Sequence, residues 1–220
     1  MKQIKRKQKG SSVASMVARE IDGDAHYRKA MELGIANLSA IAERIASKNS
    51  WGREAVKVAV ARYASKYSAS SANSLRRVQE LLVSSRISLE DGIAVVVVDN
   101  SAFSRRSFSG IEDSAVKSVV SGEAGITIVM REAYLARAEK LFGGHLLLKS
   151  KGLCLIRLSS PEKIEEVEGV YAHILEGIAR RGINVLETSS CYTETNIIVE
   201  RKDALKCFAA LEETCGRRSG

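Results

Sequence analysis

Residues 168–190 have the sequence EGVYAHILEGIARRGINVLETSS, and this stretch decides the fold. Its first half is a helix pattern, because apolar residues recur at every fourth position: Val170, Ile174 and Ile178. Gly182 follows two arginines at the end of this pattern. Cations suit the C-terminal end of a helix, and a glycine there can take the left-handed conformation that ends it. We therefore expect a helix that stops at Gly182.

A strand is expected directly after that helix. Ile183 and Val185 alternate with the polar Asn184, and the residues that follow favour extended structure. The stretch thus predicts a helix that turns tightly into a strand.

The C-terminal two thirds of the chain contain an internal repeat. GIAVVVVDNS from Gly92 and GLCLIRLSS from Gly152 are glycine-led buried-strand patterns about sixty residues apart. Each follows a short extended run, so we expect a hairpin at each place. GIEDSAVKSVVSG from Gly110 and GVYAHILEGIARRG from Gly169 are then both expected to be amphipathic helices.

The two copies differ in length after these helices. ITIVMREAYLARAEKLF from Ile126 and NIIVERKDALKCFAALE from Asn196 both predict a strand followed by a helix, now about seventy residues apart. The second copy fills the difference with INVLETSSCY, so the first copy is expected to lack one strand. The predicted fold class is α+β, with two ferredoxin-like units in which helices cover one face of an antiparallel sheet.

The second copy resembles the ACT domain, the amino-acid-sensing regulatory module found in tandem at the C-terminus of aspartokinases. The similar segments are GLCLIRLS, GVYAHILEGIARRGINVLETSS and NIIVERKDALKCFAALEE, within residues 152–213, whereas residues 92–142 match weakly. The resemblance implies a small effector, usually an amino acid, bound in the loop between the first strand and the first helix. It assigns ligand binding to Ser159, Ser160, Gly169, Val170 and Asn184.

Physical chemistry supports part of that assignment. Free N–H groups at a helix N-terminus attract a carboxylate, Gly169 lets a ligand approach the backbone, and the Asn184 amide both donates and accepts. The loop SSPEKIEEVEG carries four glutamates, which repel a carboxylate and favour a cationic ligand such as a basic amino acid. Alternatively, Ser159 caps a helix that starts at Pro161, and Gly169 then lies in the middle of that helix.

The N-terminal part of the chain is basic and helical. Residues 1–86 contain 17 Lys and Arg against 7 Asp and Glu, whereas the remainder contains 17 against 19. Breaks at Gly34 and at SKNSWG divide residues 25–67 into three helices, and LGIANLSAIAERIA is similar to part of a helix-turn-helix module. Phosphate contacts are expected from a basic arm, residues 2–9, and from Arg53, Lys57, Arg62 and Lys66. The alternative is a helical bundle or dimer cap whose basic face is solvated.

These patterns predict four segments. A helix-turn-helix-like domain spans residues 1–67, and a serine-rich linker with a connector helix spans 68–86. A degenerate ACT-like unit at 87–144 and an ACT domain at 145–216 follow. The connector helix could pair with its copy in a homodimer.

Several classes of protein find no support in the sequence. No apolar run is long enough for a membrane span and no secretory signal follows the basic start, so we expect a cytoplasmic protein without a membrane partner. The four cysteines form no CxxC pair, which predicts thiols rather than a metal or redox site. No Walker loop, GxSxG elbow or HExxH occurs, and the histidines share no ligand spacing.

Three hypotheses therefore stand. The first is a non-catalytic, homodimeric regulator that binds an amino acid through its ACT domains, needs no cofactor, and contacts DNA as a transcriptional regulator. The second is an amino-acid-sensing subunit or dimerisation module that docks on a separate metabolic enzyme without DNA. The third is an unrecognised enzyme, although the sequence contains no group of residues that is typical of a catalytic site.

Overall fold

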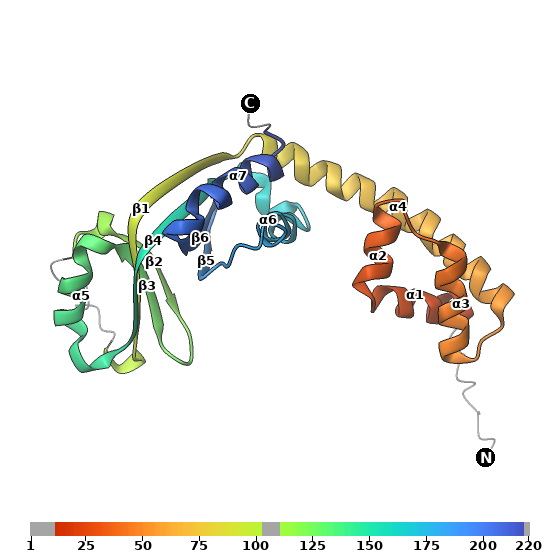
Figure 1. Cartoon of the computed structure of the whole chain (residues 1–220), viewed down its shortest axis with the longest axis horizontal. Coiled ribbons are helices and arrows are strands. Elements are labelled where there is room, and N and C mark those ends of the chain that lie inside the picture. The colour runs from red at the N-terminus through yellow and green to blue at the C-terminus, as the bar shows by residue number, and fades with distance from the viewer. Residues whose placement is uncertain (1–11, 103–110, 218–220) are drawn as a thin grey trace, which may run out of the picture. The chain divides into compact units, whose positions relative to one another are not determined.

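The computed structural model describes residues 12–102 and 111–217, and for residues 68–72 it describes the backbone alone (Figure 1). The chain forms two compact units, Met1–Arg76 and Arg77–Gly220. The basic arm at residues 2–9, expected to contact phosphates, lies outside the described residues.

The first unit is helical. It comprises α1 (Val13–Asp22), α2 (Ala25–Glu32), α3 (Leu38–Asn49) and the first part of α4 (Arg53–Val83). Both expected breaks are confirmed: Gly34 follows α2 at positive φ, and Ser50 ends α3 in the left-handed conformation. Asn37 caps α3 by accepting a hydrogen bond from the Ala40 N–H at 3.0 Å. The helix α1 was not predicted.

The helix α4 is longer than expected. It runs without interruption for 31 residues through the segment predicted to be a serine-rich linker. That prediction is wrong because alanine favours a helix and serine costs it only a few tenths of a kcal/mol. The predicted connector helix is confirmed, since Val78, Leu81 and Leu82 are buried in the core of the second unit.

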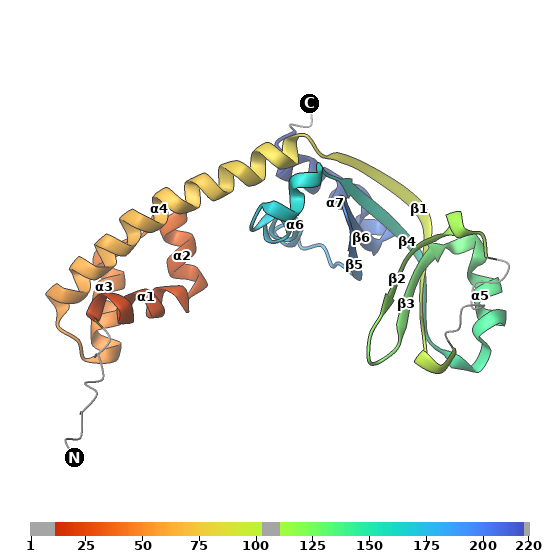
Figure 2. The same ribbon diagram turned by 180° about the vertical axis from the view of Figure 1, so that it is seen from behind.

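The second unit is built on one six-stranded antiparallel sheet with the strand order β2-β3-β1-β4-β6-β5 (Figure 2). The strands are β1 (Arg86–Val98), β2 (Val116–Ser121), β3 (Ile126–Arg131), β4 (Leu146–Ser159), β5 (Glu187–Cys191) and β6 (Glu194–Glu200). The helices are α5 (Leu135–Phe142), α6 (Val170–Ala179) and α7 (Ala204–Thr214). The predicted α+β class is thus confirmed for this unit, although β5 begins four residues later than the predicted strand.

The two hairpins expected at the start of each copy are wrong. Gly92 and Gly152 lie inside the continuous strands β1 and β4, at φ of 70° and 67°. The β1–β4 register shifts beside both glycines. Glycine can adopt this positive φ without a steric penalty. Each strand therefore bulges and bends at its glycine, and the chain does not reverse direction there. As a result, β1 and β4 pass through both halves of the unit and are shared by them.

The first half does not lack a strand. Val116–Ser121, within the segment that was expected to be a helix, form β2, which pairs with β3. Val116, Val119 and Val120 have helical spacing, but their β-branched side chains favour extended backbone. Each half therefore contributes three strands. In the described part of that segment, the 3-10 turn Asp113–Ala115 precedes β2, and no counterpart of α6 forms there.

Helices cover the sheet locally in each half. α6 and α7 lie side by side over Cys154, Ile156 and Leu158 of β4 (Figures 1 and 2). α5 packs on alternate residues of β1, including Ala94 and Val96. On these strands, residues that alternate with the helix-facing ones point to the other face of the sheet. They form a separate buried cluster: Ile93, Val95, Val129, Leu153, Leu155 and Ile198.

Gly177 sets the closeness of α6 and α7. A Cβ atom at this position would overlap Oγ1 of Thr214 on α7. Thr214 is held in place because its hydroxyl donates to the Ala210 carbonyl at 2.7 Å. The two helices can therefore approach this closely only with glycine at position 177.

We expect Gly177→Ala to lower the free energy of unfolding by about 1–2 kcal/mol, because the overlap outweighs the better helix propensity of alanine. Chemical denaturation would measure the change. Gly144→Ala is the control, since nothing lies within 4 Å of a Cβ there. Adding Thr214→Ala to Gly177→Ala should recover most of the loss, and no recovery would contradict the steric explanation.

Candidate functional site

The N-terminus of α6 is open. Gly169 occupies the N-cap in the left-handed conformation, at φ 85°, and no side chain caps the helix. The alternative with a long helix from Pro161 is wrong, because residues Glu162–Glu166 form only a 3-10 turn and Ser159 caps nothing. The first N–H groups of α6 are therefore left without a side-chain partner, which is the usual basis of an anion site.

The five predicted ligand-binding residues have different surroundings. Ser159 is the last residue of β4, and Ser160 is buried, with its Oγ 3.0 Å from Oγ of Ser85. Val170 is 1% exposed and belongs to the core. Only Gly169 and Asn184 are exposed, and no hydrogen bond among the described residues joins Asn184 to the other four. The set of ligand-binding residues predicted from the sequence therefore contains both buried residues that pack in the core and residues that a ligand could reach.

The loop before α6 is acidic and solvent-facing. Its four glutamates are all exposed: Glu162, Glu165, Glu166 and Glu168. A hydrogen bond to Glu162 raises the pKa of the Tyr192 hydroxyl. Arg77 of α4 donates to the Glu166 carbonyl oxygen at 3.3 Å, so this loop is tied to α4. The arrangement offers backbone donors for a carboxylate beside carboxylates for a cation.

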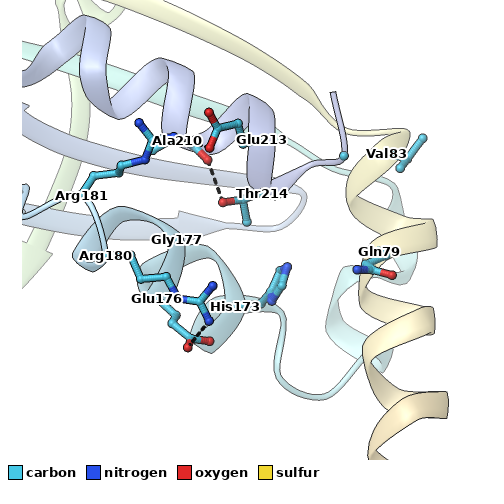
Figure 3. A pocket seen from close by; sticks show the side chains of 11 residues that line it. Gln79, Val83, His173, Glu176, Gly177, Arg180, Arg181, Ala210, Glu213 and Thr214 are labelled. Carbon is cyan, nitrogen blue, oxygen red and sulfur yellow. Dashed lines mark hydrogen bonds and ion pairs between the residues drawn. The ribbon is translucent and has the colours of Figure 1, made fainter. Parts of the chain in front are cut away.

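A cavity of about 500 Å³ lies between α6, α7 and the C-terminal end of α4 (Figure 3). Figure 3 shows Arg180 turned toward Glu176, with 2.6 Å between Nη2 and Oε1, and Arg181 pairs with Glu213. These charges are already paired and partly solvated, so a ligand here would have to displace them. The sequence alone does not reveal this cavity, because its walls come from residues that are far apart in the chain.

The four predicted phosphate contacts are exposed on α4 but do not form one row. Arg53 and Arg62 are nine residues apart, which turns the helix by about half a revolution beyond whole turns. Arg53 pairs with Glu43 at 3.4 Å, and Lys57 pairs with Glu54 at 3.6 Å. Arg62 and Lys66 have no ion pair among the described residues. They are therefore the freer cations of the four.

Three of the four thiols are buried. Burial raises the pKa of Cys154, Cys207 and Cys215 to about 11, and the Cys154 thiol also donates to Oδ1 of Asp91 at 3.3 Å. Cys191 is exposed on β5. The described residues contain no group of three His, Cys, Asp or Glu side chains that could hold a metal ion.

Comparison with known proteins bears on the fold. No protein-family model and no curated protein matches the sequence. The aspartate kinase of Clostridium acetobutylicum matches with a TM-score of 0.50 and 13% identity, over 58% of this chain and 33% of that one. Regulatory, ACT-type domains of aspartate kinases are among the solved structures to which this chain is similar, and the likeness concerns the fold.

Two further solved structures are similar to part of this chain. The ligand-free regulatory subunit of aspartate kinase from Thermus thermophilus has a TM-score of 0.49 and 13% identity, over 58% of this chain and 95% of that one. A Vibrio cholerae protein of unknown function has a TM-score of 0.48 and 20% identity, over 64% and 98%. No helix among the described residues has the length and apolar character needed to cross a membrane.

The burial of the thiols predicts their reactivity. At pH 8 a thiol-specific disulfide reagent should modify one cysteine per folded chain rapidly, because buried thiols with raised pKa values stay protonated and shielded. Absorbance of the released thiolate measures the count, with the denatured protein giving all four cysteines. Cys191→Ser should remove the fast reaction, and fast modification that persists in this variant would contradict the assignment.

Proposed function

We propose that this chain is a non-catalytic regulatory protein that binds an amino acid through its ACT-type unit. The observation that carries the proposal is the open N-terminus of α6, where left-handed Gly169 leaves the first backbone donors uncapped. The fold supports it, because the likeness is to regulatory domains. The ligand carboxylate would accept hydrogen bonds from these donors.

The exposed glutamates beside Gly169 favour a basic amino acid. A cationic side chain would gain attraction from the loop, whereas an acidic one would be repelled. Asn184 is exposed but follows the C-terminal end of α6, so the proposal does not depend on its amide. The ligand class is therefore a zwitterion with an additional positive charge.

A regulatory signal has a structural route within this unit. Val170 and Ile174 of α6 share a buried core with Val78 and Leu82 of α4. The Arg77 hydrogen bond to the Glu166 carbonyl adds a second link from the ligand loop to α4. Because α4 is one continuous helix, a shift of α6 on ligand binding would bias the position of α4.

The effector proposal is tested by thermal unfolding with each of the twenty amino acids. A ligand at about 100 times its dissociation constant adds about 2.7 kcal/mol, which raises Tm by several degrees. We expect lysine or arginine to give the largest rise. Gly169→Asn should abolish it, because asparagine tolerates the left-handed conformation but places a side chain over the donors.

Gly182→Asn is the matched control, since Gly182 is also left-handed and open to solvent at the other end of α6. It should retain the full rise in Tm. The proposal fails if no amino acid raises Tm, or if Gly169→Asn and Gly182→Asn respond alike.

Nucleic-acid binding by the first unit is a second candidate function, and the local excess of positive charge favours it. In this case the protein would be a ligand-controlled transcriptional regulator with a helix-turn-helix-like domain. Without DNA binding, the helical unit would dock on a separate metabolic enzyme. In both cases we propose a homodimer, because β2 and β5 are sheet edges with unpaired backbone groups.

Binding to a random-sequence DNA duplex at several salt concentrations separates these cases. We expect affinity to fall as salt rises, and Arg62→Ala with Lys66→Ala to reduce the slope of log affinity against log salt by about 2. Arg53→Ala with Lys57→Ala is the paired control and should have a smaller effect, because both cations already face glutamates. Fluorescence anisotropy measures the slopes, and the absence of salt-dependent binding would favour the docking subunit.

A further inference from the structure

A second cavity lies beneath α6, apart from the residues assigned to the amino-acid effector. It has a volume of about 300 Å³ and lies between α6 and the strands β5 and β6. Ile174 and Ile197 form buried parts of its wall, while Tyr171 and Leu175 are 44% and 39% exposed. Almost all of the lining surface is apolar. The cavity is therefore open to solvent on one side and apolar inside.

A hydroxyl group without a partner lines this cavity. Thr195 of β6 is 2% exposed, and its Oγ1 has no hydrogen-bond partner among the described residues. Its neighbour two positions along the strand, Ile197, faces the same core, so Thr195 points toward α6. Buried polar groups are nearly always hydrogen-bonded. Valine would fill this position with the same shape and no polar atom, so the hydroxyl needs an explanation.

The rim of the cavity is polar, and a hydrogen bond connects its two sides. The Tyr171 hydroxyl lies 2.6 Å from Oγ of Ser190, which joins α6 to the edge strand β5 at the mouth. Thr188 and Ser189 complete this side. The lining contains no carboxylate, ammonium or guanidinium group, so a charged ligand group would lose its hydration without compensation.

We propose that this cavity binds a small neutral molecule with an aromatic or branched apolar body and one carbonyl or hydroxyl group that hydrogen-bonds to Thr195. The volume suits roughly ten non-hydrogen atoms, since a water molecule occupies about 30 Å³ of the liquid. The ligand class differs from the charged effector proposed for the loop before α6. The two sites would act on the same helix from different sides.

Methyl-selective NMR of the full-length protein tests the proposal with three probes of similar size. Acetophenone carries a neutral carbonyl group, toluene has no polar group, and benzoate is charged. We expect acetophenone to shift the methyl signals of Ile174, Thr195 and Ile197 at millimolar concentration. It should bind about tenfold more tightly than toluene, because it satisfies the buried hydroxyl, and benzoate should bind more weakly than either.

Two variants of matched shape show whether the hydroxyl is responsible. Thr195→Val should remove the advantage of acetophenone and leave toluene binding within about twofold, since the pocket keeps its shape. Thr188→Val is the control, because it removes an exposed hydroxyl from the same cavity and should change neither affinity. The preference of the unmodified protein for acetophenone over toluene tests the same point without any substitution.

The proposal is overturned if no probe shifts these methyl signals, if toluene and acetophenone bind with equal affinity, or if the preference is unchanged in Thr195→Val. Binding of zwitterionic phenylalanine here, lost in Thr195→Val, would also overturn it and assign the cavity to an amino acid. This test is independent of the amino-acid effector proposal. That proposal is tested by the effect of Gly169→Asn on Tm, which does not involve Thr195.

Discussion

The pairing of β1 with β4 is the constraint on which the rest of the second unit depends. These two antiparallel strands form the centre of the sheet, and their register shifts beside Gly92 of β1 and Gly152 of β4. The bulges bend the strands, so that one end of the pair supports α6 and α7 and the other supports α5. Every cavity and loop discussed for ligand binding in this unit is positioned by that central pair.

α6 is the element through which the functional hypotheses meet. Its N-terminus offers uncapped backbone donors, its underside covers the cavity with Thr195, and its buried stripe packs against the end of α4. Gly177 presses the same helix closely against α7. A ligand at either site would therefore act on a helix that is packed tightly and has few alternative positions.

The sequence predicted local features well where one rule applied. The apolar stripe of α6, the left-handed Gly182 and the breaks in the N-terminal helices all follow from nearest neighbours. It failed where two rules competed. Gly92 suits a turn as well as a bulge, and the valines of β2 have helical spacing with strand-forming side chains. The unpartnered hydroxyl of Thr195 could not be predicted from the sequence, because its lack of a hydrogen-bond partner depends on how β5 and α6 lie around it.

The shared strands also constrain how the chain could have been assembled or divided. A fragment that ends near residue 144 contains β1 but not its partner β4, and the complementary fragment has the reverse defect. Each would expose a long, apolar strand edge that in the intact chain is buried at the centre of the sheet. Although the sequence repeats, the two copies are not separable modules. They must be inherited together, fold together and be degraded together.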